Sequence, residues 1–206
     1  MIKIRDNLAE EKASRRSNRF LVAKILLILF TVILAFNLLG ARYFSVIVSG
    51  DSMEPSLHTN DYLVVDTKKT PERGDIIIVD KTPNYLKDTD KTVWLIKRVV
   101  GLPGEKVSLV DGYVYINDVK LDEPYVIAQG VTGPAAESNP WTEFIVPEGE
   151  YLFLGDNRIG TNSKDSRYSD YLTCKKDELL GVVTNWSLKL RWLNNNLSGI
   201  LGLVSC

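Results

Sequence analysis

Cysteine and histidine are scarce in this 206-residue chain, which has two cysteines and one histidine. Two cysteines are too few for a disulfide framework, and two incidental thiols are a better interpretation of Cys174 and Cys206 than a pair. The single histidine makes an imidazole base scarce, so a nucleophilic hydroxyl would need a different base. Repeats, low-complexity tracts and long amphipathic helical periods are also missing outside one apolar run, which favours a mostly-β body.

Metal-ligand spacing is missing as well. Asp51, Glu54, Asp61 and Asp66 lie near one another in the sequence, but their spacing matches no metal site, and solvated surface carboxylates are the simpler interpretation. His58 falls in a polar turn, where we expect no catalytic role. The sequence therefore predicts neither a metal nor an organic cofactor.

Charge is divided unevenly along the chain. Residues 1–19 carry six Lys/Arg against three Asp/Glu, whereas residues 41–206 carry eighteen against twenty-three. Between them, residues 20–39 are apolar except for three positions, and as a helix they would span about 30 Å, the thickness of a bilayer core. A basic tail, an apolar run and an acidic body are typical of a membrane protein, not of a nucleic-acid-binding one.

The orientation follows from the arginines before the apolar run. Arg15, Arg16 and Arg19 favour a cytoplasmic N-terminus, which would place residues 41–206 outside the plasma membrane. We predict a single-pass protein with a tail (1–19), a signal-anchor helix in the lipid bilayer (20–39) and an extracytoplasmic catalytic domain (41–206). The alternative is a cleavable signal peptide, but the run is long for one and residues 39–42 are an untidy cleavage site.

Beyond the anchor, short segments rich in Val, Ile and aromatics predict β-strands. The expected strands are 43–48, 62–65, 75–79, 93–100, 106–109, 113–116, 119–121, 143–146, 151–154 and 181–193. Asp111-Gly112 and Asn117-Asp118 suit turns with positive φ, and residues 128–141 read as a loop. The predicted fold is a transmembrane helix followed by a mostly-β, barrel-like body, in which 104–146 is a candidate smaller, non-catalytic lobe.

Ser52 and Lys97 are the residues that carry chemistry. A serine hydroxyl is a poor nucleophile until a neighbouring base takes its proton. On a strand, Lys97 shares one face with Leu95 and Val99, and an apolar face disfavours the charged amine. Lowering a lysine pKa from about 10.4 to about 7–8 costs the charged form roughly 4 kcal/mol. Ser52 is thus the candidate nucleophile and Lys97 the candidate base.

Four motifs occur in a fixed order after the apolar run. They are Ser49-Gly-Asp-Ser-Met-Glu-Pro-Ser-Leu57, Arg73-Gly-Asp-Ile-Ile77, Lys97-Arg-Val-Val-Gly-Leu-Pro-Gly-Glu105 and Gly155-Asp-Asn-Arg-Ile-Gly-Thr-Asn-Ser-Lys-Asp-Ser-Arg167. With the N-terminal span they closely resemble the bacterial type I signal peptidases, the membrane-bound Ser/Lys proteases that remove signal peptides from exported proteins. The resemblance covers nearly all of residues 20 to about 183 and is greatest to the short Gram-positive members.

The resemblance implies a role for each matching residue. Ser52 would be the nucleophile, Lys97 the general base, and Ser163 a hydrogen-bond partner that orients the Lys97 amine. Asp165 and Arg167 would form an ion pair that braces the last motif. That motif is longer than in many members, and if its alignment is shifted, Ser166 is the next candidate for the role of Ser163.

Substrate contacts follow from the same resemblance. Some members place a serine two residues before the nucleophile as an oxyanion donor, and here that residue is Gly50. The candidate oxyanion residues are therefore Ser52 and Gly50, with the backbone N–H of Ser52 expected to contribute most. Exported preproteins would bind in extended form by strand addition, with small side chains in shallow pockets. The candidate pocket walls are Val46, Val48, Met53 and Ile96.

Other interpretations remain at this stage. Trp141 is the best candidate for a membrane-interface anchor, whereas Trp94, Trp186 and Trp192 are expected in the core. A non-catalytic assembly factor for surface structures such as pili is the main alternative function, although the chain keeps both Ser52 and Lys97. A self-cleaving Ser/Lys repressor would need a DNA-binding module, for which residues 1–19 are too short.

Overall fold

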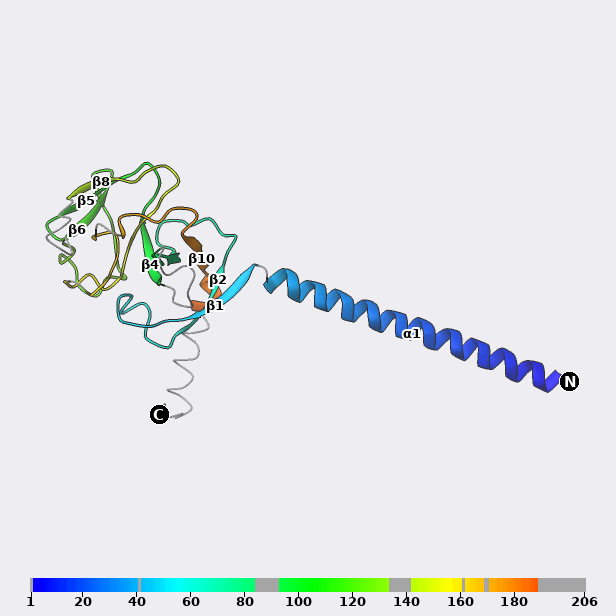
Figure 1. Cartoon of the computed structure of the whole chain (residues 1–206). Helices are drawn as coiled ribbons and strands as arrows, with labels where there is room; N and C mark the ends of the chain where they lie inside the picture. Colours follow the sequence, from blue (N-terminus) through cyan, green and yellow to red (C-terminus); the bar gives the residue numbers. More distant parts are fainter. Residues whose placement is uncertain are drawn as a thin grey trace, which may run out of the picture. The chain divides into compact units, whose positions relative to one another are not determined.

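The computed structural model describes residues 2–40, 42–83, 93–133, 142–160, 162–168 and 171–188. The chain divides into two compact units, Met1–Arg42 and Tyr43–Cys206. The first unit contains a helix and the second, the body, contains the strands (Figure 1).

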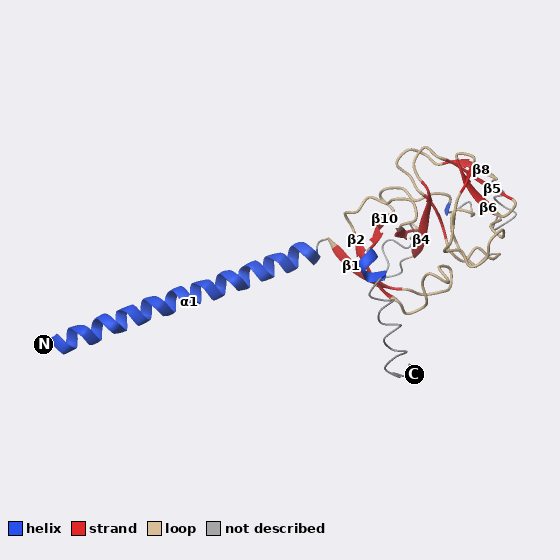
Figure 2. Cartoon of the chain, turned by 180° about the vertical axis from the view of Figure 1, so that it is seen from behind, coloured by secondary structure: helices blue, strands red, loops and turns tan. Residues whose placement is uncertain are grey.

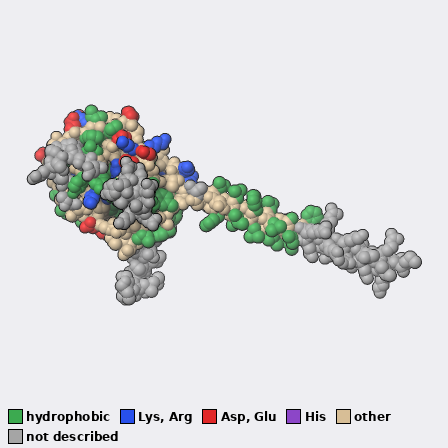
Figure 3. Space-filling model, viewed as in Figure 1, with side chains coloured by type: hydrophobic (Ala, Val, Ile, Leu, Met, Phe, Trp, Pro, Cys, Tyr) green, Lys and Arg blue, Asp and Glu red, His purple; other side chains and the backbone are tan. Residues whose placement is uncertain are grey.

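Helix α1 runs from Ile2 to Gly40, so the basic tail continues the predicted apolar helix. Its segment Phe20–Leu38 has a mean hydropathy of 2.5 and none of it is buried in the protein, which makes it long and apolar enough to cross a membrane. Figure 3 shows apolar side chains along this segment. The polar side chains of Thr31 and Asn37 donate hydrogen bonds to the carbonyls of Ile28 and Ile33, which satisfies them within the helix.

The body consists of two antiparallel sheets. The first sheet has the order β1 (Tyr43–Ile47), β2 (Tyr62–Asp66), β10 (Leu179–Val183), β3 (Ile76–Asp80), β4 (Trp94–Gly101) and β9 (Leu152–Leu154). The second has the order β7 (Val119–Lys120), β6 (Tyr113–Ile116), β5 (Lys106–Val110) and β8 (Glu143–Ile145). The mostly-β prediction is confirmed, and among the described strands neither sheet closes into a barrel.

The turns of the second sheet have the predicted chemistry. Asp111 and Gly112 join β5 to β6 with φ values of 49° and 78°, and Asn117 and Asp118 join β6 to β7 with φ values of 50° and 69°. Asn, Asp and Gly tolerate this left-handed region, and two such residues in succession match the right-handed twist of a hairpin. Local sequence therefore sets the register of this meander.

The two sheets share one hydrophobic interior. Val100, Leu152 and Leu154 of the first sheet pack in the same cluster as Val107 and Val114 of the second. Figure 1 shows β5, β6 and β8 at one end of the body and β1 and β2 at the other, with β4 between them. Residues 104–146 thus include a separate sheet, but that sheet does not form a separate compact unit.

The last predicted strand is too long. Strand β10 ends at Val183, and residues 185–188 form a helical turn, drawn in blue in Figure 2. The Thr184 carbonyl accepts hydrogen bonds from the Ser187 backbone N–H and from Ser187 Oγ, at 3.1 and 2.9 Å. Thr184 and Asn185 are residue types that favour helix starts, and this local preference ends the strand. Residues 189–193 lie outside the described part of the chain.

Two predictions of exposure were wrong. Trp94 and Trp186, expected in the core, are 47% and 49% exposed, because Trp94 begins an outer stretch of β4 and Trp186 lies on the helical turn. Asp66, expected on the surface, is 6% exposed because its strand pairs with both β1 and β10. Its Oδ1 accepts the Lys68 N–H. Trp141 and Trp192 lie outside the described residues.

Candidate active site

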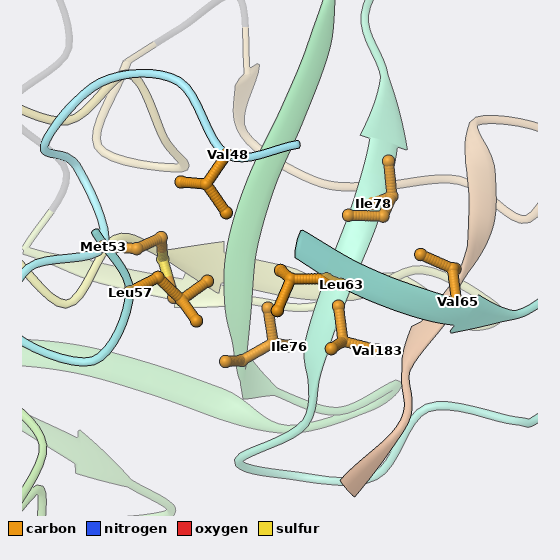
Figure 4. Close-up of a cluster of buried hydrophobic side chains, with 8 residues drawn as sticks. All are labelled: Val48, Met53, Leu57, Leu63, Val65, Ile76, Ile78 and Val183. Atoms are coloured by element: carbon orange, nitrogen blue, oxygen red, sulfur yellow. The ribbon is translucent and has the colours of Figure 1, made fainter. Parts of the chain in front are cut away.

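Ser52 lies in a turn that the core holds on one side. Met53 and Leu57 are 1% and 0% exposed, and Figure 4 shows them side by side in the cluster that includes Leu63 and Ile76. The Leu57 N–H donates to the Met53 carbonyl at 2.9 Å, which closes the turn. Burial of these two apolar side chains therefore fixes the backbone that follows Ser52.

Lys97 reaches Ser52 from the middle of β4. Its side chain is 3% exposed, and its Nζ donates hydrogen bonds to Ser52 Oγ and to the Ile96 carbonyl, each at 2.8 Å. The two residues are 45 positions apart in the sequence. The fold thus brings together the two side chains that the sequence singled out.

Burial lowers the pKa of the Lys97 amine from 10.5 to about 8. Loss of solvation is the largest cause, since a charged ammonium is costly in a low-dielectric interior. The carboxylates of Asp165 and Asp156 oppose this effect, and the charge of Arg167 adds to it. At this pKa about one Lys97 amine in ten is neutral at pH 7, compared with roughly one in three thousand for an unperturbed lysine.

The last motif packs against the backbone of Ser52. The Asn157 N–H donates to the Ser52 carbonyl at 3.1 Å. Gly155 lies so close that an added Cβ would be 2.5 Å from the Ser52 carbonyl oxygen and 2.2 Å from Ser163 Oγ. Only glycine permits this approach, so the position of the last motif relative to Ser52 depends on Gly155.

Asp165 and Arg167 form a buried ion pair within this loop. The Arg167 Nε donates to Asp165 Oδ1 at 2.9 Å, and the exposed fractions of the two side chains are 1% and 0%. Asp165 Oδ2 also accepts the Gly155 N–H, and Arg167 donates to the Arg158 carbonyl. The pair therefore links both ends of the loop that lies against Ser52.

Ser163 lies at this site but does not make the expected hydrogen bond. Its side chain is fully buried, and its Oγ has no hydrogen-bond partner among the described residues. The hydroxyl faces Gly155 instead, and the Lys97 amine donates to Ser52 and Ile96. Ser166, the second candidate, accepts the Phe153 N–H through its Oγ and so supports the fold of the loop.

The Gly50 amide is already hydrogen-bonded within the Ser52 turn. Gly50 has a φ of 91°, and its N–H donates to Thr59 Oγ1 at 3.1 Å, while the same hydroxyl donates to the Gly50 carbonyl at 3.2 Å. The predicted role of Gly50 in the oxyanion site therefore requires this hydrogen bond to Thr59 to break. The Ser52 N–H is the remaining predicted donor.

An open cleft of about 310 Å³ leads away from Ser52 and Lys97. The four predicted wall residues, Val46, Val48, Met53 and Ile96, all line it. Trp94, Asn162 and Lys164 also line it, and the sequence did not assign them to the site. The cleft therefore has an apolar wall from β1 and β4 and a polar margin from the last motif.

Two further ion pairs support the site, and the sequence motifs include only three of their four residues. Arg98 donates to Asp156 through its Nε at 2.8 Å and its Nη2 at 2.5 Å, and Arg158 donates to Glu123 at 2.5 and 3.1 Å. Asp156 and Arg158 lie in the last motif, so their positions carried a signal. Glu123 lies in an irregular segment outside the motifs, and nothing in the sequence marked it as part of the site.

The remaining sequence candidates lie outside the chemistry. His58 Nδ1 is 2.6 Å from Glu54 Oε2, its side chain is 52% exposed, and it does not line the cleft. Cys174 is a buried free thiol, and Cys206 lies outside the described residues. Among the described residues, no three His, Cys, Asp or Glu side chains are grouped to hold a metal ion.

Comparisons with known proteins identify the family of the chain. Residues 21–187 match the family described as signal peptidase, peptidase S26. The chain is 34% identical over 178 residues to signal peptidase I of Bacillus licheniformis, which covers 82% of this chain and 89% of that protein. It is 39% identical over 145 residues to the probable signal peptidase I-2 of Synechocystis, covering 68% and 59%. A crystal structure of a signal peptidase I from Enterococcus faecalis V583 is 34% identical, with a TM-score of 0.42, and covers 56% of this chain and 98% of that one.

Proposed function

The chain belongs to the signal peptidase family, peptidase S26, and we propose that it removes signal peptides from exported preproteins with Ser52 as nucleophile and Lys97 as general base. One observation carries the assignment of the two roles. The buried Lys97 Nζ lies 2.8 Å from Ser52 Oγ, and the lowered pKa of this amine leaves a useful fraction of it neutral.

The first step is acylation of Ser52. A neutral amine can donate one hydrogen to the Ile96 carbonyl and keep its lone pair for the Ser52 hydroxyl proton. As Lys97 takes this proton, Ser52 Oγ bonds to the scissile carbonyl carbon, and the carbonyl carries the negative charge that the Ser52 N–H would stabilise. The C–N bond then breaks, the leaving amine takes the proton from Lys97, and the signal peptide remains as an ester on Ser52.

The second step is hydrolysis of that ester. Lys97, neutral again, takes a proton from water, and the resulting hydroxide attacks the ester carbonyl. The Ser52–carbonyl bond breaks, Ser52 recovers its proton, and the signal peptide leaves with a carboxylate. Asp165 and Arg167 support the loop through their ion pair. Ser163 would orient the Lys97 amine only if its Oγ, which has no hydrogen-bond partner among the described residues, turned toward that amine.

The unpaired strand edges beside the cleft support extended binding of the substrate. Among the described strands β1 pairs only with β2, and β9 pairs with β4 only from Arg98 onward. The backbone of residues 94–97 is therefore unpaired on the side away from β3, and this side faces the cleft. A peptide strand can add its hydrogen bonds there, and Val46, Val48, Met53 and Ile96 leave room for small side chains.

The apolar helix supports membrane anchorage of the enzyme. We propose that Phe20–Leu38 spans the plasma membrane once, with the basic tail in the cytoplasm and residues 41–206 outside as the catalytic domain. Anchorage would raise the local concentration of membrane-bound preproteins at the cleft.

The test is cleavage of a purified preprotein in detergent micelles, with the cleavage site read by mass spectrometry. We expect the intact chain to cut after a small residue, and Ser52→Ala and Lys97→Ala each to lose cleavage while keeping the near-UV circular dichroism of the intact chain. Residual cleavage by either folded variant would contradict the dyad. Failure of the intact chain on several preproteins would contradict the peptidase function.

The assembly-factor alternative has no comparable support. Its bearers would be expected to lose one of the two active residues, whereas Ser52 and Lys97 are both present here and in contact. Relatives from Synechocystis, Bacillus licheniformis and Bacillus subtilis carry signal peptidase names.

A further inference from the structure

The apolar wall of the cleft extends beyond the four predicted residues to an exposed tryptophan. Trp94 lines the cleft with 47% of its surface exposed. Its ring makes an edge-to-face contact with Phe44, with the ring centroids 6.1 Å apart and the planes at 69°. Phe44 is partly buried against the core, so it supports Trp94 from behind. An aromatic face that is braced on one side and open on the other can bind an apolar side chain.

The two strands that form the wall run in the same direction. Phe44 contacts Trp94 at one end, and the Ser52 turn that follows β1 contacts Lys97 at the other. Alternate residues of a strand share a face, so Trp94 lies on the same face of β4 as Ile96. Phe44 and Val46 likewise share the inner face of β1, and Val48, buried just after the end of β1, continues their alternation. The wall therefore has three successive levels, at Val48, at Val46 with Ile96, and at Phe44 with Trp94.

These levels match the repeat of an extended substrate. Alternate residues of a strand are separated by about 6.6 Å, in the enzyme and in a bound peptide alike. If the first residue before the scissile bond faces the level of Val48, the third faces Val46 and Ile96, and the fifth faces Trp94. Trp94 is also three residues before Lys97, about 10 Å along the strand, which is well beyond the reach of the first subsite.

We propose that Trp94, supported by Phe44, forms a subsite for a large apolar side chain at the fifth position before the scissile bond. This inference rests on the proposed function, because it concerns the substrate of the same cleft. The first and third positions face Val, Ile and Met side chains in the enclosed part of the wall. The fifth faces an open aromatic surface, so a Leu or Phe fits there without steric conflict and gains contact area that Ala lacks.

The experiment uses the full chain in detergent micelles and a set of peptides that differ only at the fifth position. All peptides carry Ala at the first and third positions, and the fifth is Leu, Phe, Ala or Asp. We expect the intact chain to favour Leu and Phe over Ala by about tenfold in kcat/KM, the lower end for a hydrophobic pocket. The difference should be in KM, because the contact is made equally in the ground state and the transition state.

The variants separate a subsite from a structural role. Trp94→Ala should reduce the preference to less than about twofold while still cleaving the Ala peptide, and Trp94→Phe should retain most of it. Trp186→Ala is the matched control, because Trp186 is 49% exposed and does not line the cleft, and it should leave the preference unchanged.

Each remaining outcome contradicts the inference. An intact chain that cleaves all four peptides equally, or a Trp94→Ala variant that keeps the preference, would show that Trp94 is not a subsite while leaving the proposed function standing. A Trp94→Ala variant impaired only on preproteins in liposomes would assign Trp94 to membrane contact instead. An intact chain that cleaves none of the peptides and no preprotein would overturn the proposed function, and the subsite with it.

Discussion

The Lys97 side chain is buried, and among the described residues no carboxylate is hydrogen-bonded to its amine. Its Nζ donates to a hydroxyl and a carbonyl, and the carboxylates that act on it do so through their charge without a hydrogen bond among those described. A carboxylate in direct contact would hold the amine protonated and useless as a base. The nearby Asp165 is instead paired with Arg167, which offsets its charge.

The pH dependence of cleavage should report the Lys97 amine. Because the reaction needs the neutral form, we expect kcat/KM to rise about tenfold per pH unit below pH 8 and to level off above the pKa of about 8. The measurement is a pH series with a peptide that has no group titrating between pH 6 and 10. A profile that is flat from pH 6 to 9 would contradict a lysine base.

Burial of the Lys97 amine should also make the stability of the body depend on pH. The folded pKa of Lys97, about 8, lies below the unfolded value of 10.5, so the unfolded chain binds more protons between these values. The free energy of unfolding therefore rises with pH through this window, and the cost of burying the amine is present in full below about pH 8.

Lys97→Met removes this cost while keeping most of the side-chain volume. At pH 7 we expect the variant to unfold with a free energy higher by up to about 3 kcal/mol, and this advantage should vanish by pH 11. The measurement is chemical denaturation of both proteins in detergent micelles at each pH. A difference that does not change with pH would mean that packing, and not ionisation, separates the two proteins.

Strand β4 and the loop of residues 155–167 are the elements that build the site. β4 supplies Lys97 and part of the cleft wall, and among the described strands no strand pairs with its outer half on the side of β9. The loop is held from two directions, by the Arg98–Asp156 pair and by Arg158, whose guanidinium donates to Glu123, Thr132 and the Gly155 carbonyl. The segment between β7 and β8 of the second sheet therefore helps to position the loop that contacts Ser52.

Glu123→Gln should disturb this arrangement strongly. Arg158 is 0% and Glu123 6% exposed, so the change leaves a buried guanidinium without its counter-charge. Breaking a buried pair in this way costs about 3–5 kcal/mol. We expect a loss of that size in the free energy of unfolding, with a lower kcat because Gly155 moves.

A surface pair gives the control. Asp118→Asn removes a partner of Lys106 from a pair in which Asp118 is 76% exposed, and this should cost less than about 1 kcal/mol with no effect on kcat. Equal effects of the two substitutions would show that the Glu123–Arg158 pair does not position the loop.

The whole molecule joins an apolar helix to a catalytic body by a short connection. α1 ends at Gly40 and β1 begins at Tyr43, so few residues separate the anchor from the strand that leads to Ser52. The body carries both signs of charge on its surface (Figure 3), whereas the charge before the anchor is mainly positive. Orientation in the membrane should depend on that difference.

Replacing Arg15, Arg16 and Arg19 with Glu should weaken the predicted orientation. Positive charge within about 15–20 residues of a span holds that end in the cytoplasm. We expect a larger fraction of chains to have the body inside, measured as protection from protease added to spheroplasts. Replacing Lys175 and Lys176 with Glu is the control, and because these residues are far from the span the fraction should stay unchanged. Equal protection of all three proteins would contradict the proposed topology.

The sequence by itself determined the features that depend on local pattern. The apolar run predicted α1, the Asp-Gly and Asn-Asp pairs predicted two hairpin turns, and the ordered motifs predicted the family and the pairing of Ser52 with Lys97. These succeed because turn chemistry, strand periodicity and motif order are properties of short segments. The prediction of the last strand was too long for a local reason too, since Thr184 begins a helical turn that competes with the strand pattern.

Only the tertiary structure decided the features that depend on contacts between residues far apart in the sequence. The pKa of Lys97 needs several strands to exclude water, the partner of Arg158 comes from a loop with no motif, and the exposure of Trp94 follows from where β9 stops pairing with β4. The missing Ser163 hydrogen bond and the occupied Gly50 amide likewise depend on distances between segments. Desolvation and contact arise from the packing of the whole chain, and no window of sequence contains them.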